Sequence, residues 1–389
     1  MSTLFDDQIP ITKPNLGLEE WESIKDVILS GWVSQGQKAA EFEDSVASFV
    51  GAKYAVAANS CTSALHLALK IHNIGSGDEV ILPDSTCMAD ANAIILSGAS
   101  PVFVDVDEKT YNIDPQKTED AISSKTKALM AVAQNGMSAD LDSFRSIADK
   151  HNLVLIDDSA TALGAEYKGK RLGSHGITAA FSFHPRKMIT TGEGGIIVTD
   201  NKELADRARE LRSHGASVSD MERHKAKGTI VQQYFVNGYN YRFTDIQAAI
   251  GLIQMSKLDT FINKRREQAV FYNNAFKDIE ELEIPFVPEN CYHVYSSYPL
   301  KINSIAKFTP KDILEKLSEK NISCRFGITP LHQEPYFSSQ NLADRDFPGS
   351  CLVSKHTFYI PIFPDLSKKE LVYIKDSILE FVDDLRKNR

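Results

Sequence analysis

Short apolar runs alternate with amphipathic stretches over residues 54–200 of the chain. Within these stretches apolar side chains recur at helical spacing, as Leu65, Ala68 and Leu69 do. Strands that alternate regularly with helices are typical of a mainly parallel sheet covered by helices. The runs predict strands at residues 54–58, 79–83, 101–106, 127–133, 153–157, 178–183 and 195–199.

The flanks of this block have other patterns. Helices are expected at residues 18–29 and 39–49, and helices dominate residues 202–277. The last third predicts a strand at 295–302, a helix at 309–320 that Pro310 opens, and a helix at 368–385. We therefore expect an α/β protein with a large domain over residues 1–260 and a smaller C-terminal α/β domain over residues 261–389, although no Pro- or Gly-rich linker marks the boundary.

Composition narrows the class of protein. The 389 residues include 43 Lys and Arg against 52 Asp and Glu, and the net charge of -9 disfavours a nucleic-acid partner. The five cysteines form no CxxC pair, so the spacing predicts neither a disulfide framework nor a metal site. The N-terminus lacks a basic and then apolar leader, and no apolar run is long enough to span a membrane. We expect a cytoplasmic protein.

The signature motifs of dinucleotide-binding, P-loop, zincin and serine hydrolase proteins are absent. What remains is a set of polar residues at or just past the ends of predicted strands, where open α/β sheets bind ligands. The run from Asn59 to Ser63 joins a strand to a helix, and its hydroxyls could either cap the helix or bind an anion. Asp158 follows another strand, and it could cap a helix or pair with a ligand cation.

The third candidate is Lys187, in the run FSFHPRKMITTGEGG at residues 181–195. The glycines Gly192, Gly194 and Gly195 let the backbone pass close to a bound group. A lysine that is partly desolvated there could form a Schiff base, whereas most loop lysines are simply solvated. A lysine, a carboxylate and an anion cradle are together what pyridoxal phosphate requires: a partner for its aldehyde, for its ring nitrogen and for its phosphate.

The chain resembles the DegT-type sugar aminotransferases, which have the fold of aspartate aminotransferase (fold type I) and use pyridoxal phosphate. The resemblance extends over nearly the whole chain. It is carried in order by the segments SGWVSQG, FVGAKYAV, SALHLAL, GDEVILP, PVFVDVD, YNIDP, FSFHPRKMITTGEGG, GYNYRFTDIQAAIG and PLHQEPY.

The resemblance implies a role for each matching residue. Lys187 would bind the cofactor's aldehyde, and Asp158 would pair with its pyridine nitrogen. Asn240 would reach across a homodimer interface to the phosphate of the neighbouring subunit. The other implied positions are phosphate contacts at Thr62, Ser63 and Ser182, and substrate contacts at Trp32 and His332, although His332 could equally be a structural residue of its PLH turn.

Three positions depart from the pattern of the family. Cys87 stands where members usually carry an aromatic residue that stacks on the cofactor, and Thr161 where they often have glutamine or glutamate near the cofactor hydroxyl. Ala133 replaces a usual histidine. Because the lysine and the aspartate are retained, these changes bear on the substrate and leave the cofactor in place.

The implied reaction is transamination, with L-glutamate as amino donor and a nucleotide-linked keto-deoxy sugar as acceptor, which gives an amino sugar nucleotide. Two alternatives stay open at this point. The three departures could reflect a different acceptor, such as a small phosphorylated ketone. The chain could also be a binding or regulatory protein that keeps the fold without catalysis. A dehydratase of this fold is disfavoured, since relatives with that chemistry replace the lysine with histidine and Lys187 is present.

Overall fold

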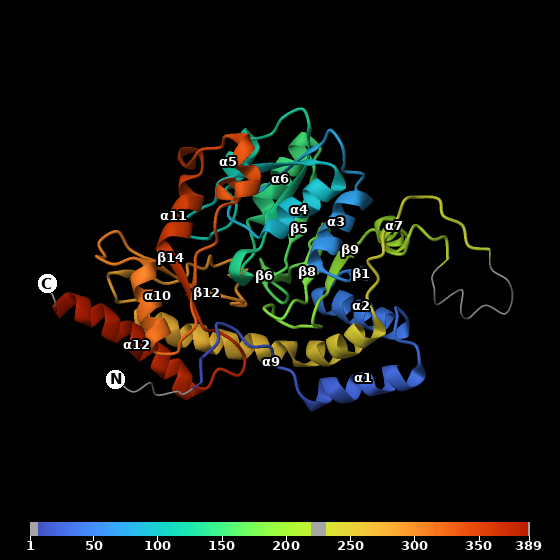
Figure 1. Cartoon of the computed structure of the whole chain (residues 1–389). Coiled ribbons are helices and arrows are strands. Elements are labelled where there is room, and N and C mark those ends of the chain that lie inside the picture. The colour runs from blue at the N-terminus through green and yellow to red at the C-terminus, as the bar shows by residue number, and fades with distance from the viewer. Residues whose placement is uncertain (1–6, 219–230, 388–389) are drawn as a thin grey trace.

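The computed structural model describes residues 7–218 and 231–387. At its centre is a seven-stranded sheet in the order β1-β9-β8-β5-β4-β2-β3, in which β9 alone runs antiparallel to its neighbours (Figure 1). All seven predicted strands are confirmed, with ends that differ by at most two residues. They are β1 (Tyr54–Ala58), β2 (Glu79–Pro83), β3 (Ser100–Val104), β4 (Thr126–Val132), β5 (Val154–Asp158), β8 (Thr178–Ser182) and β9 (Gly195–Thr199).

Helices cover both faces of this sheet, which explains why its strands are apolar on both sides. In β9, Ile197 packs with α3, α4 and α7 on one face, while Ile196 and Val198 pack with α2 and α9 on the other. Helix α6 lies on the same face as α2 and α9, farther along the sheet. The bounds are α2 (Gln37–Val50), α3 (Cys61–Ile71), α4 (Met88–Ser97), α5 (Pro115–Asp120), α6 (Leu141–His151), α7 (Lys202–Arg212) and α9 (Asp245–Phe276).

A second core is built around a four-stranded antiparallel sheet in the order β10-β12-β14-β13. Helices α10 and α12 and the C-terminal half of α9 pack on it. Its elements are β10 (Leu282–Glu283), β12 (Tyr298–Ile302), α10 (Pro310–Glu319), β13 (Arg325–Phe326), β14 (Thr357–Ile360) and α12 (Lys368–Lys387). The predicted strand and both predicted helices of this part are confirmed.

Helix α9 joins the two cores without a break. Leu258 belongs to the core under the large sheet and Phe276 to the C-terminal core, so the boundary proposed near residue 260 falls within one helix. The beginning of the chain also reaches the C-terminal core, where Ile9 pairs with Ile322. The helical region expected over residues 202–277 is interrupted, because the described residues between α7 and α9 are not helical and Thr244 caps a new helix at Asp245.

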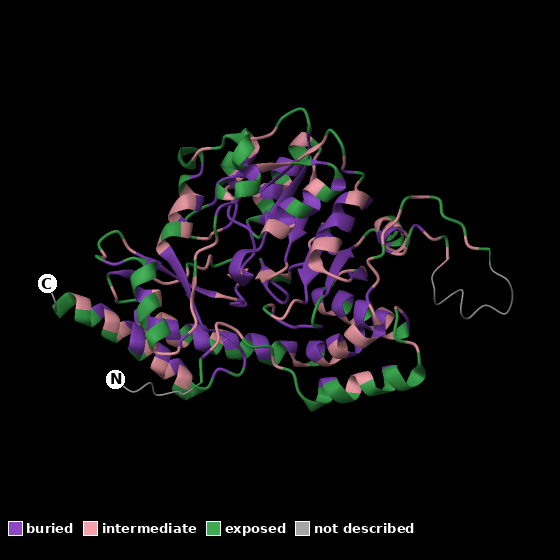
Figure 2. Ribbon diagram, viewed as in Figure 1, coloured by how far each residue is buried: buried purple, intermediate pink, exposed green. Residues whose placement is uncertain are grey.

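Helix α1 (Leu18–Ser30) lies along the outside of α9 and is exposed over most of its surface (Figures 1 and 2). The side chain of Glu20, in this helix, is buried and accepts hydrogen bonds from Gln254 (2.8 Å) and Lys257 (2.7 Å) on α9. No helix in the described part of the chain is long and apolar enough to cross a membrane.

Small elements complete the described fold and connect the two cores. They are the three-stranded sheet of β6 (Glu166–Tyr167), β7 (Lys170–Arg171) and β11 (Cys291–Tyr292), helix α11 (Pro348–His356), and the 3₁₀ helices η1 (Gln134–Gly136), η2 (Leu331–Gln333), η3 (Pro335–Gln340) and η4 (Asp344–Asp346).

Candidate active site

The carboxyl ends of β1, β5 and β8 lie at one edge of the central sheet, because these three strands are parallel to one another. The N-terminus of α3 follows β1, Asp158 ends β5, and Lys187 lies in the loop after β8. The three predicted groups are close enough to interact. Burial raises the pKa of the Cys61 thiol in α3, and the charges of both Asp158 and Lys187 act on that thiol.

Serine side chains shape the N-terminus of α3. Ser60 caps the helix by accepting a hydrogen bond from the Ser63 backbone N–H (3.1 Å), and the Ser63 hydroxyl donates to Asn59 Oδ1 (2.7 Å). Strand β9 approaches this turn closely, since a Cβ on Gly195 would lie 2.5 Å from the Ser60 carbonyl oxygen. Thr62 is in the first turn of α3. Backbone N–H groups without helical partners therefore lie beside Thr62 and Ser63, as a phosphate requires.

Asp158 is buried at the end of β5 beside a second carboxyl, Asp90 of α4. One Asp158 oxygen accepts from the Ala160 backbone N–H (3.0 Å). Burial raises the pKa of Asp158, while Asp90 and the charge of Lys187 lower it. Asp157 faces the other way, accepts from Ser159 Oγ (2.9 Å), and has a pKa that burial raises to about 7. Of the two adjacent aspartates, only Asp158 interacts with Lys187.

Asp90 was not predicted from the sequence. Its side chain is completely buried, its Oδ2 accepts from Thr86 Oγ1 (2.5 Å), and its Oδ1 has no well-formed hydrogen bond. Burial and the charge of Asp158 raise the pKa of Asp90 well above its ordinary value. Asp90 lies in the first turn of α4, where an acidic residue is normally explained by its favourable interaction with the helix dipole. No other feature of the sequence indicated that Asp90 is buried.

Lys187 is partly buried, and its backbone N–H closes a turn to the His184 carbonyl (2.9 Å). Its Nζ makes no hydrogen bond or ion pair with any residue that the structure describes. A lysine amine near a buried carboxylate, yet bonded to neither protein donor nor acceptor, is free to react with a carbonyl group.

Three further predicted cofactor residues lie around this centre. Ser182 is buried at the end of β8, where its hydroxyl accepts from the His184 backbone N–H (3.4 Å). Thr161 donates to the Ala133 carbonyl (2.6 Å) and accepts from the Gly136 N–H (3.2 Å), so its hydroxyl holds two loops together. Cys87 precedes α4 and is exposed as a residue, but desolvation of its sulfur raises the pKa of the thiol. The charges of Asp90, Lys187 and Asp158 also act on this thiol.

Two predicted residues lie farther out, at positions open to another chain. Asn240 is exposed next to α3, where its carbonyl accepts from Asn59 Nδ2 (3.4 Å). Trp32 is half-buried in the turn between α1 and α2, and its indole N–H donates to the Gln35 carbonyl (3.1 Å). Asp245 holds this turn by accepting from the Gly36 N–H (2.7 Å) and the Ala39 N–H (3.0 Å).

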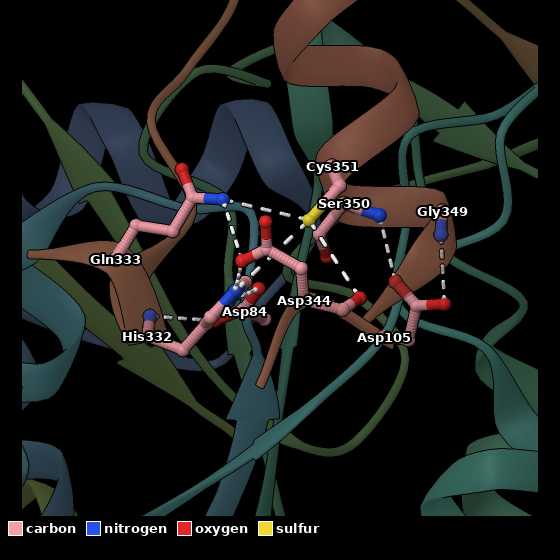
Figure 3. Close-up of polar contacts among 8 residues, drawn as sticks. All are labelled: Asp84, Asp105, His332, Gln333, Asp344, Gly349, Ser350 and Cys351. Atoms are coloured by element: carbon pink, nitrogen blue, oxygen red, sulfur yellow. Dashed lines mark hydrogen bonds and ion pairs between the residues drawn. The ribbon is translucent and has the colours of Figure 1, made fainter. Parts of the chain in front are cut away.

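His332 lies in a different environment, between carboxylates at the ends of β2 and η4 (Figure 3). Its ring is buried, with Nδ1 2.7 Å from Asp84 Oδ2 and Nε2 3.0 Å from Asp344 Oδ1. Its backbone N–H also donates to Asp84 Oδ1 (2.9 Å). Because both nitrogens face carboxylates, this geometry favours the structural alternative over a substrate contact.

The model of the DegT/DnrJ/EryC1/StrS aminotransferase family matches residues 14–379. The chain belongs to this family. The aminotransferase is 39% identical over 382 residues to the spore coat polysaccharide biosynthesis protein SpsC of Bacillus subtilis, and the match covers 97% of each chain. The family match shows that the protein is an enzyme and excludes the alternative of a non-catalytic binding protein.

Solved structures of similar proteins agree with this assignment. PseC of Helicobacter pylori, an aminotransferase involved in the biosynthesis of pseudoaminic acid, superposes with a TM-score of 0.89 at 29% identity, over 97% of this chain and 100% of that one. Spr1654 of Streptococcus pneumoniae in its PLP form gives a TM-score of 0.90 at 25% identity, over 97% and 99%. The protein is a sugar aminotransferase of fold type I that depends on pyridoxal phosphate.

The residues at the sheet edge fit that cofactor. Asp158 is a buried carboxylate, and no lysine, arginine or histidine in the described structure bonds to it. It is therefore available to pair with a protonated ring nitrogen. The N-terminus of α3 offers N–H groups to a phosphate, and Lys187 Nζ is available to an aldehyde. Glycine at position 195 lets β9 approach the α3 turn closely, because a Cβ there would lie 2.5 Å from the Ser60 carbonyl oxygen.

Proposed function

We propose that the aminotransferase moves the amino group of L-glutamate to a keto group of a nucleotide-linked keto-deoxy sugar and releases an amino sugar nucleotide. One observation carries the proposal: an unbonded lysine amine, a buried aspartate and a helix N-terminus meet at one edge of the sheet. The acceptor class is supported by the relatives, since SpsC serves polysaccharide biosynthesis and PseC the biosynthesis of pseudoaminic acid.

Each residue has a distinct task in this proposal. Pyridoxal phosphate supplies an aldehyde that captures amines and a protonated ring that withdraws electrons from the neighbouring carbon. Asp158 would keep the proton on the ring nitrogen. Thr62, Ser63, Ser182 and the first backbone N–H groups of α3 would hold the phosphate. Lys187 would hold the aldehyde, and its amine, when free, would act as the general base that removes the proton from the donor's Cα.

We also infer that the active unit is a homodimer. Exposed apolar side chains on α1, namely Leu18, Trp21, Ile28 and Leu29, form a face that a second chain could cover. Asn240 is exposed, as a residue that contacts the partner's phosphate must be before assembly. Sedimentation of Trp21→Glu tests this: we expect the dimer to weaken and cofactor affinity to fall with it. A monomeric wild-type protein with full cofactor affinity would contradict the inference.

The first experiment follows the visible absorption of the protein with pyridoxal phosphate, then with L-glutamate, and then with candidate acceptors. We expect the cofactor band to shift on addition of glutamate and to return when a nucleotide-linked keto sugar is added. Return of the band with a small phosphorylated ketone alone would reject the proposed acceptor. Failure of glutamate to shift the band would reject the proposed donor.

Lys187→Ala is the matched variant for this experiment. We expect turnover to fall by at least about 10²- to 10⁴-fold, because the general base is removed. Asp158 and α3 remain, so the protein still binds the cofactor, although without a covalent bond to the chain. Normal multiple turnover by Lys187→Ala would overturn the assigned role of the lysine.

A further inference from the structure

Three short elements bring the side chains of His332, Asp344 and Cys351 together (Figure 3). They are η2, η4 and the first turn of α11. All three residues follow Lys187 by more than 100 positions in the sequence. His332 Nε2 lies 3.0 Å from Asp344 Oδ1 and 4.0 Å from Cys351 Sγ. The three ligand atoms all lie within 4.8 Å of one another. Imidazole nitrogen, carboxylate oxygen and thiolate sulfur are the three donors that zinc prefers in proteins.

Asp84 fixes the orientation of the imidazole. The His332 Nδ1 is 2.7 Å from one Asp84 oxygen, and the ring stacks on Phe347 with a centroid separation of 4.5 Å. Metal-binding histidines are commonly held in this way, by a carboxylate that accepts from the nitrogen not used for the metal. An Nδ1–H that donates to Asp84 leaves a lone pair on Nε2, which points toward Asp344 and Cys351.

The cluster is rich in negative charge. Asp84 and Asp344 lie on opposite sides of the His332 ring, and Asp105 accepts from the Ser350 backbone N–H next to Cys351. Asp105 is already satisfied by Lys117 Nζ (2.7 Å) and by two backbone N–H groups at the start of α11. Lys117 is thus engaged elsewhere, and in the described structure no lysine or arginine bonds to Asp84 or Asp344.

We propose that His332 Nε2, Asp344 Oδ1 and Cys351 Sγ bind a divalent cation of the zinc class, with Asp84 as the supporting carboxylate. A tetrahedral zinc ion, with bonds of about 2.0–2.1 Å to nitrogen and oxygen and about 2.3 Å to sulfur, needs about 3.4 Å between N and O and about 3.6 Å between N and S. The observed 3.0 and 4.0 Å each differ from these values by about 0.4 Å. Asp344 is exposed, so it can move by that amount.

Gln333 completes the surroundings of the ion. Its side-chain amide lies 3.0 Å from Asp344 Oδ1 and 3.5 Å from Cys351 Sγ. The oxygen and nitrogen of an amide exchange places by a flip of the side chain. After the flip, the oxygen faces the proposed ion and either ligates it or accepts from a water molecule in the fourth position. No metal site was predicted from the sequence, because the cysteines form no CxxC pair. The ligands proposed here lie in three separate turns, so no short spacing motif connects them.

A cation-free alternative accounts for part of the same geometry. A protonated His332 could donate to both Asp84 and Asp344, which would make a buried ion triad. That arrangement gives Cys351 no role, whereas a bound metal requires its sulfur. The dependence of binding on Cys351 therefore separates the two explanations, and this test does not depend on aminotransferase activity.

The experiment uses the cofactor-loaded protein without amino donor. Zinc content is measured by equilibrium dialysis with elemental analysis, and Co²⁺ is titrated while its visible d–d bands are followed at wavelengths beyond the cofactor's absorption. We expect one equivalent of zinc with a dissociation constant of about 1 µM or tighter, and cobalt bands of tetrahedral intensity. Cys351→Ser and Asp344→Asn are expected to weaken zinc binding at least about tenfold.

Cys291→Ser is the matched control, because Cys291 is a half-buried thiol on β11, outside the cluster. It is expected to bind zinc as the wild type does. Equal zinc binding by the wild type, Cys351→Ser and Asp344→Asn would overturn the proposal. So would the absence of bound zinc in the wild type, or loss of zinc in Cys291→Ser.

Discussion

Two buried aspartates at the same edge of the sheet have opposite surroundings. Asp84, after β2, receives a backbone N–H and an imidazole from His332 on its two oxygens. Asp158, at the end of β5, receives one backbone N–H and faces a second carboxyl, Asp90. A carboxylate that the protein satisfies itself contributes to the fold, whereas one that is left short of donors is available to a ligand cation.

Replacing each aspartate with asparagine tests this comparison, and of the variants considered it has the largest expected effect on stability and cofactor affinity. Asp84→Asn removes the charged partner of a buried imidazole, and we expect the free energy of unfolding to fall by about 3 kcal/mol. Asp158→Asn removes a carboxylate whose burial is unfavourable, so we expect stability to be kept while cofactor affinity falls. Denaturant unfolding and cofactor titration of both variants measure the two quantities. Equal loss of stability in both would remove the distinction.

Asp90 offers a sharper test on the cofactor side. Asp90 lowers the pKa of Asp158, so Asp90→Leu is expected to raise it, while Asp90→Asn keeps a neutral donor in place. The cofactor needs ionised Asp158, and binding is lost as the pH falls through the pKa of Asp158. We expect Asp90→Leu to lose cofactor affinity about one to two pH units above Asp90→Asn. Cofactor titration across pH measures this, and identical profiles would show that Asp90 does not act on Asp158.

Gly195→Ala has the smallest expected effect. The added methyl group would meet the Ser60 carbonyl and the Cys61 backbone at 2.5–2.6 Å, so β9 and α3 must separate. We expect a loss of about 1–3 kcal/mol in stability and weaker phosphate binding. Ala179→Gly, in the neighbouring strand β8, is a control that alters a strand backbone away from this turn. Unchanged phosphate affinity in Gly195→Ala would show that the close approach does not shape the cradle.

Local pattern explains which parts of this structure were predictable. The seven strands follow from short apolar runs, and Lys187 and Asp158 from their position after such runs. The family resemblance supplied their roles. The partners of His332 were not predictable, since Asp84 lies 248 residues away and Asp344 and Cys351 are in turns without periodicity. Burial of Asp90 depends on the tertiary packing that brings the start of α4 beside Asp158, which no local signal encodes.

The continuity of α9 has a thermodynamic consequence. This helix supplies side chains to both hydrophobic cores, and Ile9 adds a second link from the start of the chain. Loss of the C-terminal core would leave about half of a 32-residue helix without packing, and unwinding it would expose apolar groups of the other core. The two cores are thus energetically coupled, and we expect them to melt in a single cooperative transition although each has its own sheet.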